Sequence, residues 1–214
     1  MEEPTFTELL ERDFSWPKIG DKLFSPDQPA YGAFLAGHSG ERLHHLTEGY
    51  KLAADLLVEQ AEAEVWRRRT LVYPIVFCYR HFLELTLKAM LKEYGSMGST
   101  TPNWSHHRLQ DLWRDFRTLI TSLDGDHQDE QGTEAVEQCI AEFAKIDPFS
   151  ETFRYPTRRK GQPFDVPYEM IDLLQLRDTM QAIENYFMCA DGILDSDIAM
   201  APLRAGLVLR PSGH

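Results

Sequence analysis

The chain has 214 residues, with 22 Lys and Arg against 34 Asp and Glu, and a formal net charge of −12. This length allows one large domain with a sizeable core. Because non-specific affinity for nucleic acids comes mainly from cationic contacts to phosphate, the acidic balance excludes a general polyanion binder and confines any nucleic-acid role to a local site.

The N-terminal residues 1–39 interleave aromatic side chains with prolines and glycines. They are too aromatic for a disordered arm and too interrupted for long helices. We expect an irregular segment that wraps a helical body or a second copy of the chain, held there by its aromatic residues. These residues are Phe6, Phe14, Trp16, Phe24, Tyr31 and Phe34.

A domain of helices is predicted over residues 40–193. Its first helix runs from Gly40 to about Arg69, where apolar residues keep helical spacing and acidic residues lie mostly opposite. Arg67, Arg68 and Arg69 fall at the expected C-terminal end, where cations complement the helix dipole. An anion site on these arginines is the alternative interpretation.

The central element is predicted from Tyr73 to Gly95. Pro74 fits the first turn of a helix, and Gly95 fits a left-handed residue just past its end. The apolar residues cover far more than one stripe, so we expect other helices to enclose this one. They are Ile75, Val76, Phe77, Phe82, Leu83, Leu85, Leu87, Ala89, Met90 and Leu91.

A charged row lies on this apolar helix. Arg80, Glu84 and Lys88 recur at steps of four, which places a carboxylate between two cations on one line. As structure, the row is a buried or half-buried ion triad that is tolerated only when well paired. As function, a guanidinium held by a carboxylate is a preorganised binder of phosphate or carboxylate groups. His81, one residue on, is expected to point away from the row.

Three further helices are predicted. They run from about His106 to Leu123, from Thr133 to Ile146, and from Tyr168 to about Ile193. Ser105 or Asn103 can cap the first of them. Residues 124–132 indicate a solvated acidic turn, and residues 194–214 a loosely held tail. Because no alternating strand pattern occurs, the predicted fold is an all-α bundle of about five principal helices.

A long loop is predicted at residues 147–167, because its four prolines exclude regular helix. Loops of this length are commonly functional. Pro156 forces Tyr155 into an extended conformation, so Arg154 and Tyr155 are presented in a defined way. Such a pair serves either to bind an anion or a stacked base, or to anchor the loop on a helix.

The same loop is locally basic and contains Arg158, Arg159 and Lys160, with a short hairpin expected around Gly161. In a chain this acidic, the local reversal of charge favours a phosphate-bearing ligand.

The cysteines indicate a reducing compartment. Cys78, Cys139 and Cys189 are far apart, odd in number and set among apolar neighbours on predicted helices, which is typical of reduced core residues. No secretory signal is found, and no apolar run approaches the roughly 18 to 20 residues that span a bilayer. The sequence therefore predicts a cytoplasmic protein without a membrane partner.

No pattern fixes a reaction. A phosphate-cradling glycine loop, GxSxG, HExxH and paired CxxC are all absent. The pairs His44-His45 and His106-His107 lack the spacing that places two imidazoles on one helical face, so neither a metal nor a cofactor is predicted.

His107 is the candidate base. In the first turn of a helix, the positive end of the dipole would keep its imidazole neutral and able to accept a proton. The alternative is a histidine that merely packs or hydrogen-bonds at a helix start. His107 and Arg80 are the candidate catalytic residues. The candidate ligand- or phosphate-binding residues are Arg80, Glu84, Lys88, Arg154, Tyr155, Arg158 and Arg159.

Three groups of residues resemble bacterial proteins of the HEPN superfamily. They are YPIVFCYRHFLELTLKAML, His107-Arg108-Leu109 with Leu112-Trp113, and Asp147-Pro148 with Phe153-Arg154-Tyr155-Pro156. The resemblance implies a helical bundle, typically homodimeric, in toxin–antitoxin, abortive-infection and other anti-phage systems. It also implies that catalytic relatives are metal-independent RNases, in which an arginine holds the scissile phosphate and a histidine a few residues later transfers protons.

This chain departs from that motif, because none of its histidines follows an arginine at the required spacing. We therefore expect a HEPN-like dimerising module that binds RNA, a nucleotide or a protein from the same operon. The alternative is a metal-independent endoribonuclease with a non-standard Arg/His site, and a purely structural subunit is the third hypothesis.

Overall fold

The computed structural model describes residues 7, 16–24, 32–35, 37–122, 129–158 and 160–208, of which 201–208 are described by their backbone alone. The chain divides into two compact units, Met1–Leu35 and Ala36–His214.

The first unit contains a turn in which the main-chain N–H of Asp21 donates to the carbonyl of Lys18 at 3.0 Å. Its described aromatic side chains, Trp16, Phe24 and Phe34, are exposed, and the packing expected for them stays a prediction. Phe6, Phe14 and Tyr31 lie outside the described residues.

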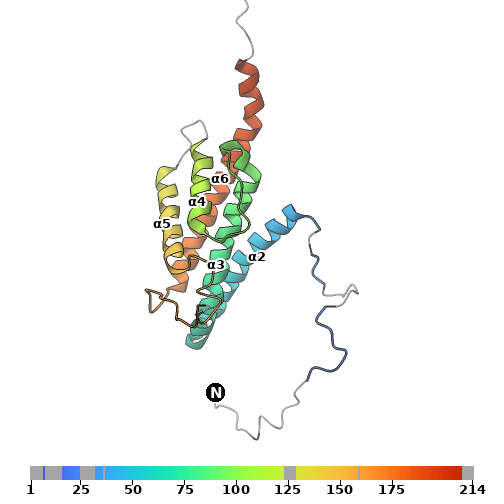
Figure 1. Cartoon of the computed structure of the whole chain (residues 1–214), viewed down its shortest axis with the longest axis vertical. Coiled ribbons are helices and arrows are strands. Elements are labelled where there is room, and N and C mark those ends of the chain that lie inside the picture. The colour runs from blue at the N-terminus through green and yellow to red at the C-terminus, as the bar shows by residue number, and fades with distance from the viewer. Residues whose placement is uncertain are drawn as a thin grey trace, which may run out of the picture. The chain divides into compact units, whose positions relative to one another are not determined.

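The second unit is all-helical, which confirms the predicted fold class (Figure 1). Its helices are α2 (Ser39–Glu62), α3 (Val65–Tyr94), α4 (Leu109–Thr121), α5 (Glu130–Ile146) and α6 (Leu173–Val208), with the short 3-10 helix η1 (Gly95–Gly98) after α3. No strand occurs in the part of the chain that the structure describes.

Helix α3 is the element that the others enclose. It packs against α2 along much of its length and against α4 and α6, while α5 packs on α4 and α6 (Figure 1). Ile75, Leu83 and Leu87 on α3 are fully buried, and burial of each such side chain contributes about 1.5–3 kcal/mol. The central position predicted for this helix is therefore correct.

The boundary between α2 and α3 differs from the prediction. Helix α2 ends at Glu62 and α3 begins at Val65, because Glu64 is extended, with φ −147° and ψ 137°. Arg68 closes the end of α2 from the start of α3, donating from Nε to the carbonyl of Ala61 at 3.2 Å. The prediction of a single helix from Gly40 to about Arg69 was therefore wrong. No glycine or proline marks this turn, so the sequence carried no signal for it.

Both ends predicted for the central helix also need correction. Pro74 lies inside α3 rather than in its first turn. Gly95 is right-handed, with φ −57°, and the left-handed residue is Ser99, with φ 56°, at the end of η1. The chain therefore tightens into one more turn before it leaves the helix.

The later helices start and stop at other residues than predicted. Helix α4 begins at Leu109, so Ser105 does not cap it; its N–H donates to Asn103 Oδ1 at 2.9 Å in a local turn. Helix α6 begins after Asp172, whose Oδ1 accepts from the N–H of Leu174 at 3.0 Å. The helix then continues to Val208 rather than ending near Ile193.

Helix α5 starts at Glu130, earlier than predicted, because Asp129 caps it by accepting from the N–H of Gly132 at 2.9 Å. Of the acidic turn predicted at residues 124–132, residues 124–128 lie outside the described residues. Residues 130–132 belong to the first turn of α5, so the prediction was wrong for them.

The cysteines agree only in part with the prediction. All three are free thiols, and Cys78 is buried, but Cys139 is half-buried and Cys189 is exposed on α6. Cys189 is therefore not a core residue.

Gly95 places the loop that leads to α4. A Cβ at this position would collide with the carbonyl oxygen of Thr100, whose N–H in turn donates to the Gly95 carbonyl at 2.8 Å. Any larger residue would push the loop away from the bundle.

We expect Gly95→Ala to lower the free energy of unfolding by about 1–3 kcal/mol, because the clash is with backbone that has little room to move. Urea unfolding followed by circular dichroism measures this change. The matched control is Gly49→Ala in α2, where an added Cβ meets nothing within 4 Å; it should be neutral or stabilise by up to about 1 kcal/mol. Equal losses in both variants would contradict the argument.

Candidate functional site

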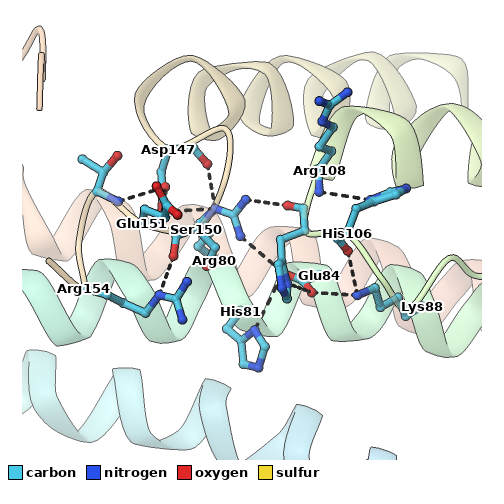
Figure 2. A network of polar contacts seen from close by, with 12 residues as sticks. Arg80, His81, Glu84, Lys88, His106, Arg108, Asp147, Ser150, Glu151 and Arg154 are labelled. Carbon is cyan, nitrogen blue, oxygen red and sulfur yellow. Dashed lines mark hydrogen bonds and ion pairs between the residues drawn. The ribbon is translucent and has the colours of Figure 1, made fainter. Parts of the chain in front are cut away.

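The charged row of α3 forms a buried cluster centred on Glu84 (Figure 2). The side chains of Arg80 and Glu84 are 0% and 1% exposed. Oε1 of Glu84 lies 2.8 Å from Nζ of Lys88 and 2.8 Å from Nδ1 of His107, while Oε2 lies 3.4 Å from Nη1 of Arg80. The carboxylate of Glu84 therefore connects Arg80 and Lys88 on α3 with His107 in the loop that precedes α4.

Arg80 uses its remaining donors on main-chain carbonyls. Its Nε donates to Asp147 O at 2.9 Å and its Nη2 to His107 O at 2.7 Å; Nε also lies 3.4 Å from Asp147 Oδ2. Burial lowers the pKa of the guanidinium, an effect that the carboxylates of Asp147 and Glu84 oppose. Arg80 thus connects α3 to two loops and has no surface to offer a ligand, which supports the structural interpretation of the row.

Lys88 is equally enclosed, with 3% of its side chain exposed. Its ammonium donates to Glu84 Oε1 and, at 3.0 Å, to the carbonyl of His106. Together Arg80 and Lys88 clamp consecutive carbonyls of the loop before α4. Two cations then face two carboxylates, Glu84 and Asp147, so the cluster is electrically balanced.

Glu84 is held ionised. Burial alone would raise its pKa, but the nearby imidazole of His81, hydrogen bonds from Lys88 and His107 and the charge of Lys88 outweigh this effect and hold the pKa well below its ordinary value of 4.5. The carboxylate therefore stays an acceptor throughout the physiological range.

His107 connects this buried charge to the solvent. Half of its side chain is exposed, and because Glu84 is ionised, the ring proton belongs on Nδ1, which leaves Nε2 free to accept a proton. The prediction that His107 lies in the first turn of its helix was wrong, since α4 begins only at Leu109. A buried carboxylate, rather than a helix end, orients this imidazole.

His81 also faces the carboxylate, contrary to the prediction that it points away. Its Nδ1 lies 3.9 Å from Glu84 Oε2, because residues three apart share one face of a helix. The ring stacks on Phe77 at 5.6 Å and meets the edge of Tyr50 at 4.4 Å. Two imidazoles of restricted orientation thus share one carboxylate.

Arg154 and His81 both contact the ring of Phe77 on α3. Its Nε donates to the carbonyl of Ser150, and its guanidinium lies over the rings of Phe77 at 5.5 Å and of Tyr155 at 5.4 Å. The side chain is exposed, and its two terminal nitrogens have no hydrogen-bond partner among the described residues. This arginine is oriented by the protein but keeps donors for a ligand.

The other predicted residues of the loop are less closely associated with the cluster. Tyr155 is half exposed beside Arg154. Arg158 lies over Phe164 at 5.7 Å and its carbonyl accepts from the N–H of Gly161 at 2.8 Å, in a tight turn. Arg159 lies outside the described residues.

Two residues of the cluster were not singled out as site residues. Asp147 buries its carboxylate beside Arg80 and caps the following turn, its Oδ1 accepting from the N–H of Glu151 at 2.7 Å. His81 follows Arg80 directly in the sequence. The Asp147-Pro148 dipeptide at a helix end and the i, i+3 spacing of His81 and Glu84 are the signals that could have identified them.

Two cavities lie near this region of the bundle. A largely apolar one of about 440 Å³ lies between α5 and α6, and an open, more polar one of about 730 Å³ lies between the loop before α4 and the start of that helix. Neither is lined by Glu84 or His107. Within the described ranges, no group of three or more His, Cys, Asp or Glu side chains is placed to hold a metal ion.

Comparison of the chain with protein-family models, curated proteins and solved structures gives no match. The resemblance to HEPN proteins therefore stays a prediction. Among the residues that the structure describes, no helix combines the length and the apolar character required to cross a bilayer.

We expect Glu84→Gln to lower the free energy of unfolding by about 3–5 kcal/mol at neutral pH, because it leaves Arg80 and Lys88 buried without a full counter-charge. Since the pKa of Glu84 is depressed on folding, its contribution is complete above 4.5, the ordinary value, and is lost as the pH falls through the folded-state pKa. The gap between parent and variant should therefore narrow in acid.

Urea unfolding at neutral pH and below pH 4.5 tests this pH dependence. Glu59→Gln, at an exposed position of α2, is the matched control and should stay within about 0.5 kcal/mol of the parent. A gap between the parent and Glu84→Gln that stays constant with pH would refute the role assigned to the ionised carboxylate.

Proposed function

We propose that this chain is a HEPN-like, cytoplasmic module that binds a phosphate group of RNA or of a nucleotide, in a bacterial defence or toxin–antitoxin type system. The observation that carries the proposal is the arrangement of Arg154, whose guanidinium is held in place by Ser150, Phe77 and Tyr155 while its terminal donors remain available. A guanidinium fixed in this way loses little entropy when it binds a phosphate.

The chemistry of the neighbouring residues supports an anionic ligand. Arg80 and Lys88 neutralise Glu84 and Asp147 inside the bundle, so the buried cluster presents no excess negative charge to the surface. The partners of Glu84 that reach solvent are His107, whose side chain is 49% exposed, and His81, whose side chain is 22% exposed. The guanidinium of Arg154 lies over Phe77, the ring on which His81 stacks. This is a local cationic and hydrogen-bonding surface on a chain of net charge −12.

Dimerisation and a protein partner from the same operon belong to the proposal through the resemblance to HEPN proteins. A second copy would place a second histidine and a second guanidinium on the same assembly, and two phosphate sites on one dimer would increase the affinity for a strand long enough to reach both.

A second candidate function, metal-independent RNA cleavage, is favoured by the pair that His107 forms with Glu84. The carboxylate of Glu84 lies 2.8 Å from Nδ1 and orients the ring, while 49% of the His107 side chain is exposed, so an RNA strand can reach the imidazole. His107 would remove the proton of a ribose 2′-hydroxyl, whose oxygen attacks the adjacent phosphorus and displaces the 5′-oxygen.

In this reaction Arg154, not the enclosed Arg80, would stabilise the charge on the phosphate. His81, which shares the carboxylate, would give a proton to the departing oxygen. The products would be a 2′,3′-cyclic phosphate and a 5′-hydroxyl, and no further reactant is needed to form them.

We expect Arg154→Ala to weaken the binding of a fluorescent single-stranded RNA at least about fivefold at low salt, because one charge-assisted contact to phosphate contributes about 1.5–3 kcal/mol. Fluorescence anisotropy measures the dissociation constant. Arg42→Ala, which removes an exposed arginine of α2, is the matched control and should bind like the parent. A parent protein that binds neither RNA nor nucleotides would overturn the proposed function.

For cleavage, we expect the parent to cut single-stranded RNA in the presence of EDTA and His107→Ala to lose at least about a hundredfold in rate, as for other general bases. Gel analysis of end-labelled RNA, with detection of the cyclic phosphate, measures this loss. His45→Ala removes an exposed histidine of α2 and should cleave at the parental rate. Cleavage that persists in His107→Ala would exclude this histidine as the base.

A further inference from the structure

The open cavity of about 730 Å³ beside the start of α4 has an aromatic wall. Trp104 lines it and is 52% exposed. The ammonium of Lys88 lies over the indole, 5.6 Å from the ring centroid, so one face of the ring covers the buried cluster. Because Trp104 both lines the cavity and is half exposed, part of its ring is accessible to a ligand there.

The loop that carries Trp104 is anchored rather than loose. Lys88 donates to the carbonyl of His106 at 3.0 Å, and Arg80 donates to that of His107 at 2.7 Å. Asn103 Oδ1 accepts from both the N–H and the hydroxyl of Ser105. These bonds fix the backbone on the C-terminal side of Trp104, so a ligand that uses the ring need not order the loop first.

The polar groups across the cavity suit an uncharged partner better than a phosphate. Asp111 pairs with Arg114 at 2.7 Å, and Asp115 and His106 also contribute to the lining. The cavity lining therefore offers both hydrogen-bond donors and acceptors and carries no net positive charge. Such a lining can hydrogen-bond the edge of a planar heterocycle that stacks on the indole.

The cavity adjoins the histidine surface. Trp104 and His107 are three residues apart, a span of at most about 11 Å along the chain. Arg154 lies over Phe77 and Trp104 lies under Lys88, and these two positions of α3 are about 16 Å apart along the helix axis. A single strand of a few nucleotides can therefore place a phosphate at Arg154 and a base on Trp104. Stacking on an aromatic side chain tolerates any base and contributes about 1–3 kcal/mol.

We propose that Trp104 is a stacking platform for one unpaired nucleobase of the ligand, in the cavity between the loop before α4 and Asp111, Arg114 and Asp115. This inference rests on the proposed function, because it assumes a ligand whose phosphate binds at Arg154. It adds a second subsite, specific for a base rather than for a charge.

The test measures binding of a fluorescent oligoadenylate and of an abasic oligomer with the same phosphates to the folded full chain. Trp104→Ala should weaken oligoadenylate binding about tenfold and leave binding of the abasic oligomer unchanged. Trp104→Phe, which keeps an aromatic face, should recover most of the loss. Trp66→Ala removes another exposed tryptophan that also has a cation over its ring, here Arg67 at 5.7 Å, and should match the parent.

The outcomes separate this inference from the function on which it rests. If the parent binds neither oligomer, the proposed function fails and the platform with it. If the parent binds both oligomers equally well, or if Trp104→Ala binds oligoadenylate like the parent, the platform alone is excluded. Should Trp104→Ala not fold, the tryptophan emission decides: oligoadenylate should quench it in the parent but much less in Trp104→Phe, and equal quenching would exclude the platform.

Discussion

The structure depends on keeping one ionised carboxylate, Glu84, inside a helix bundle. Moving a charge from water into a protein interior costs several kcal/mol even after relaxation, and the interaction is favourable only when the surrounding donors are well placed. Here both oxygens have cationic partners from the same helix, Arg80 and Lys88. Those cations use their other donors on loop carbonyls, so the balance of charge inside α3 also decides where two loops lie.

A second buried network of charged residues joins helices without contacting a histidine, and it can be compared with the cluster around Glu84. Lys51 on α2 lies 2.8 Å from Asp55 and 3.3 Å from Glu184 on α6, and Asp55 accepts from the hydroxyl of Tyr79 on α3 at 2.7 Å. This network joins three helices, and no histidine takes part in the contacts described. Around Glu84, by contrast, two imidazoles connect the buried charge to solvent.

Much of the fold could be predicted from the sequence, because the apolar pattern of a central helix differs from that of its amphipathic neighbours. The charged row was also visible, since a step of four places Arg80, Glu84 and Lys88 on one line. The orientation of His107 and the burial of Asp147 were not, because both result from contacts between residues 23 or more positions apart. The turn at Ala63 and Glu64 was missed because neither residue is a turn former.

The balance of charges around Glu84 indicates which role the imidazole of His107 has in the cluster. Arg80 and Lys88 already match Glu84 and Asp147 charge for charge, so no additional proton on an imidazole is needed to neutralise the cluster. A His107 ring that donates a hydrogen bond from Nδ1 to Glu84 satisfies one remaining acceptor site of the carboxylate, which a water molecule could equally do at a surface. The feature that water could not supply is an imidazole nitrogen of fixed direction, and this is what the proposed cleavage of RNA requires.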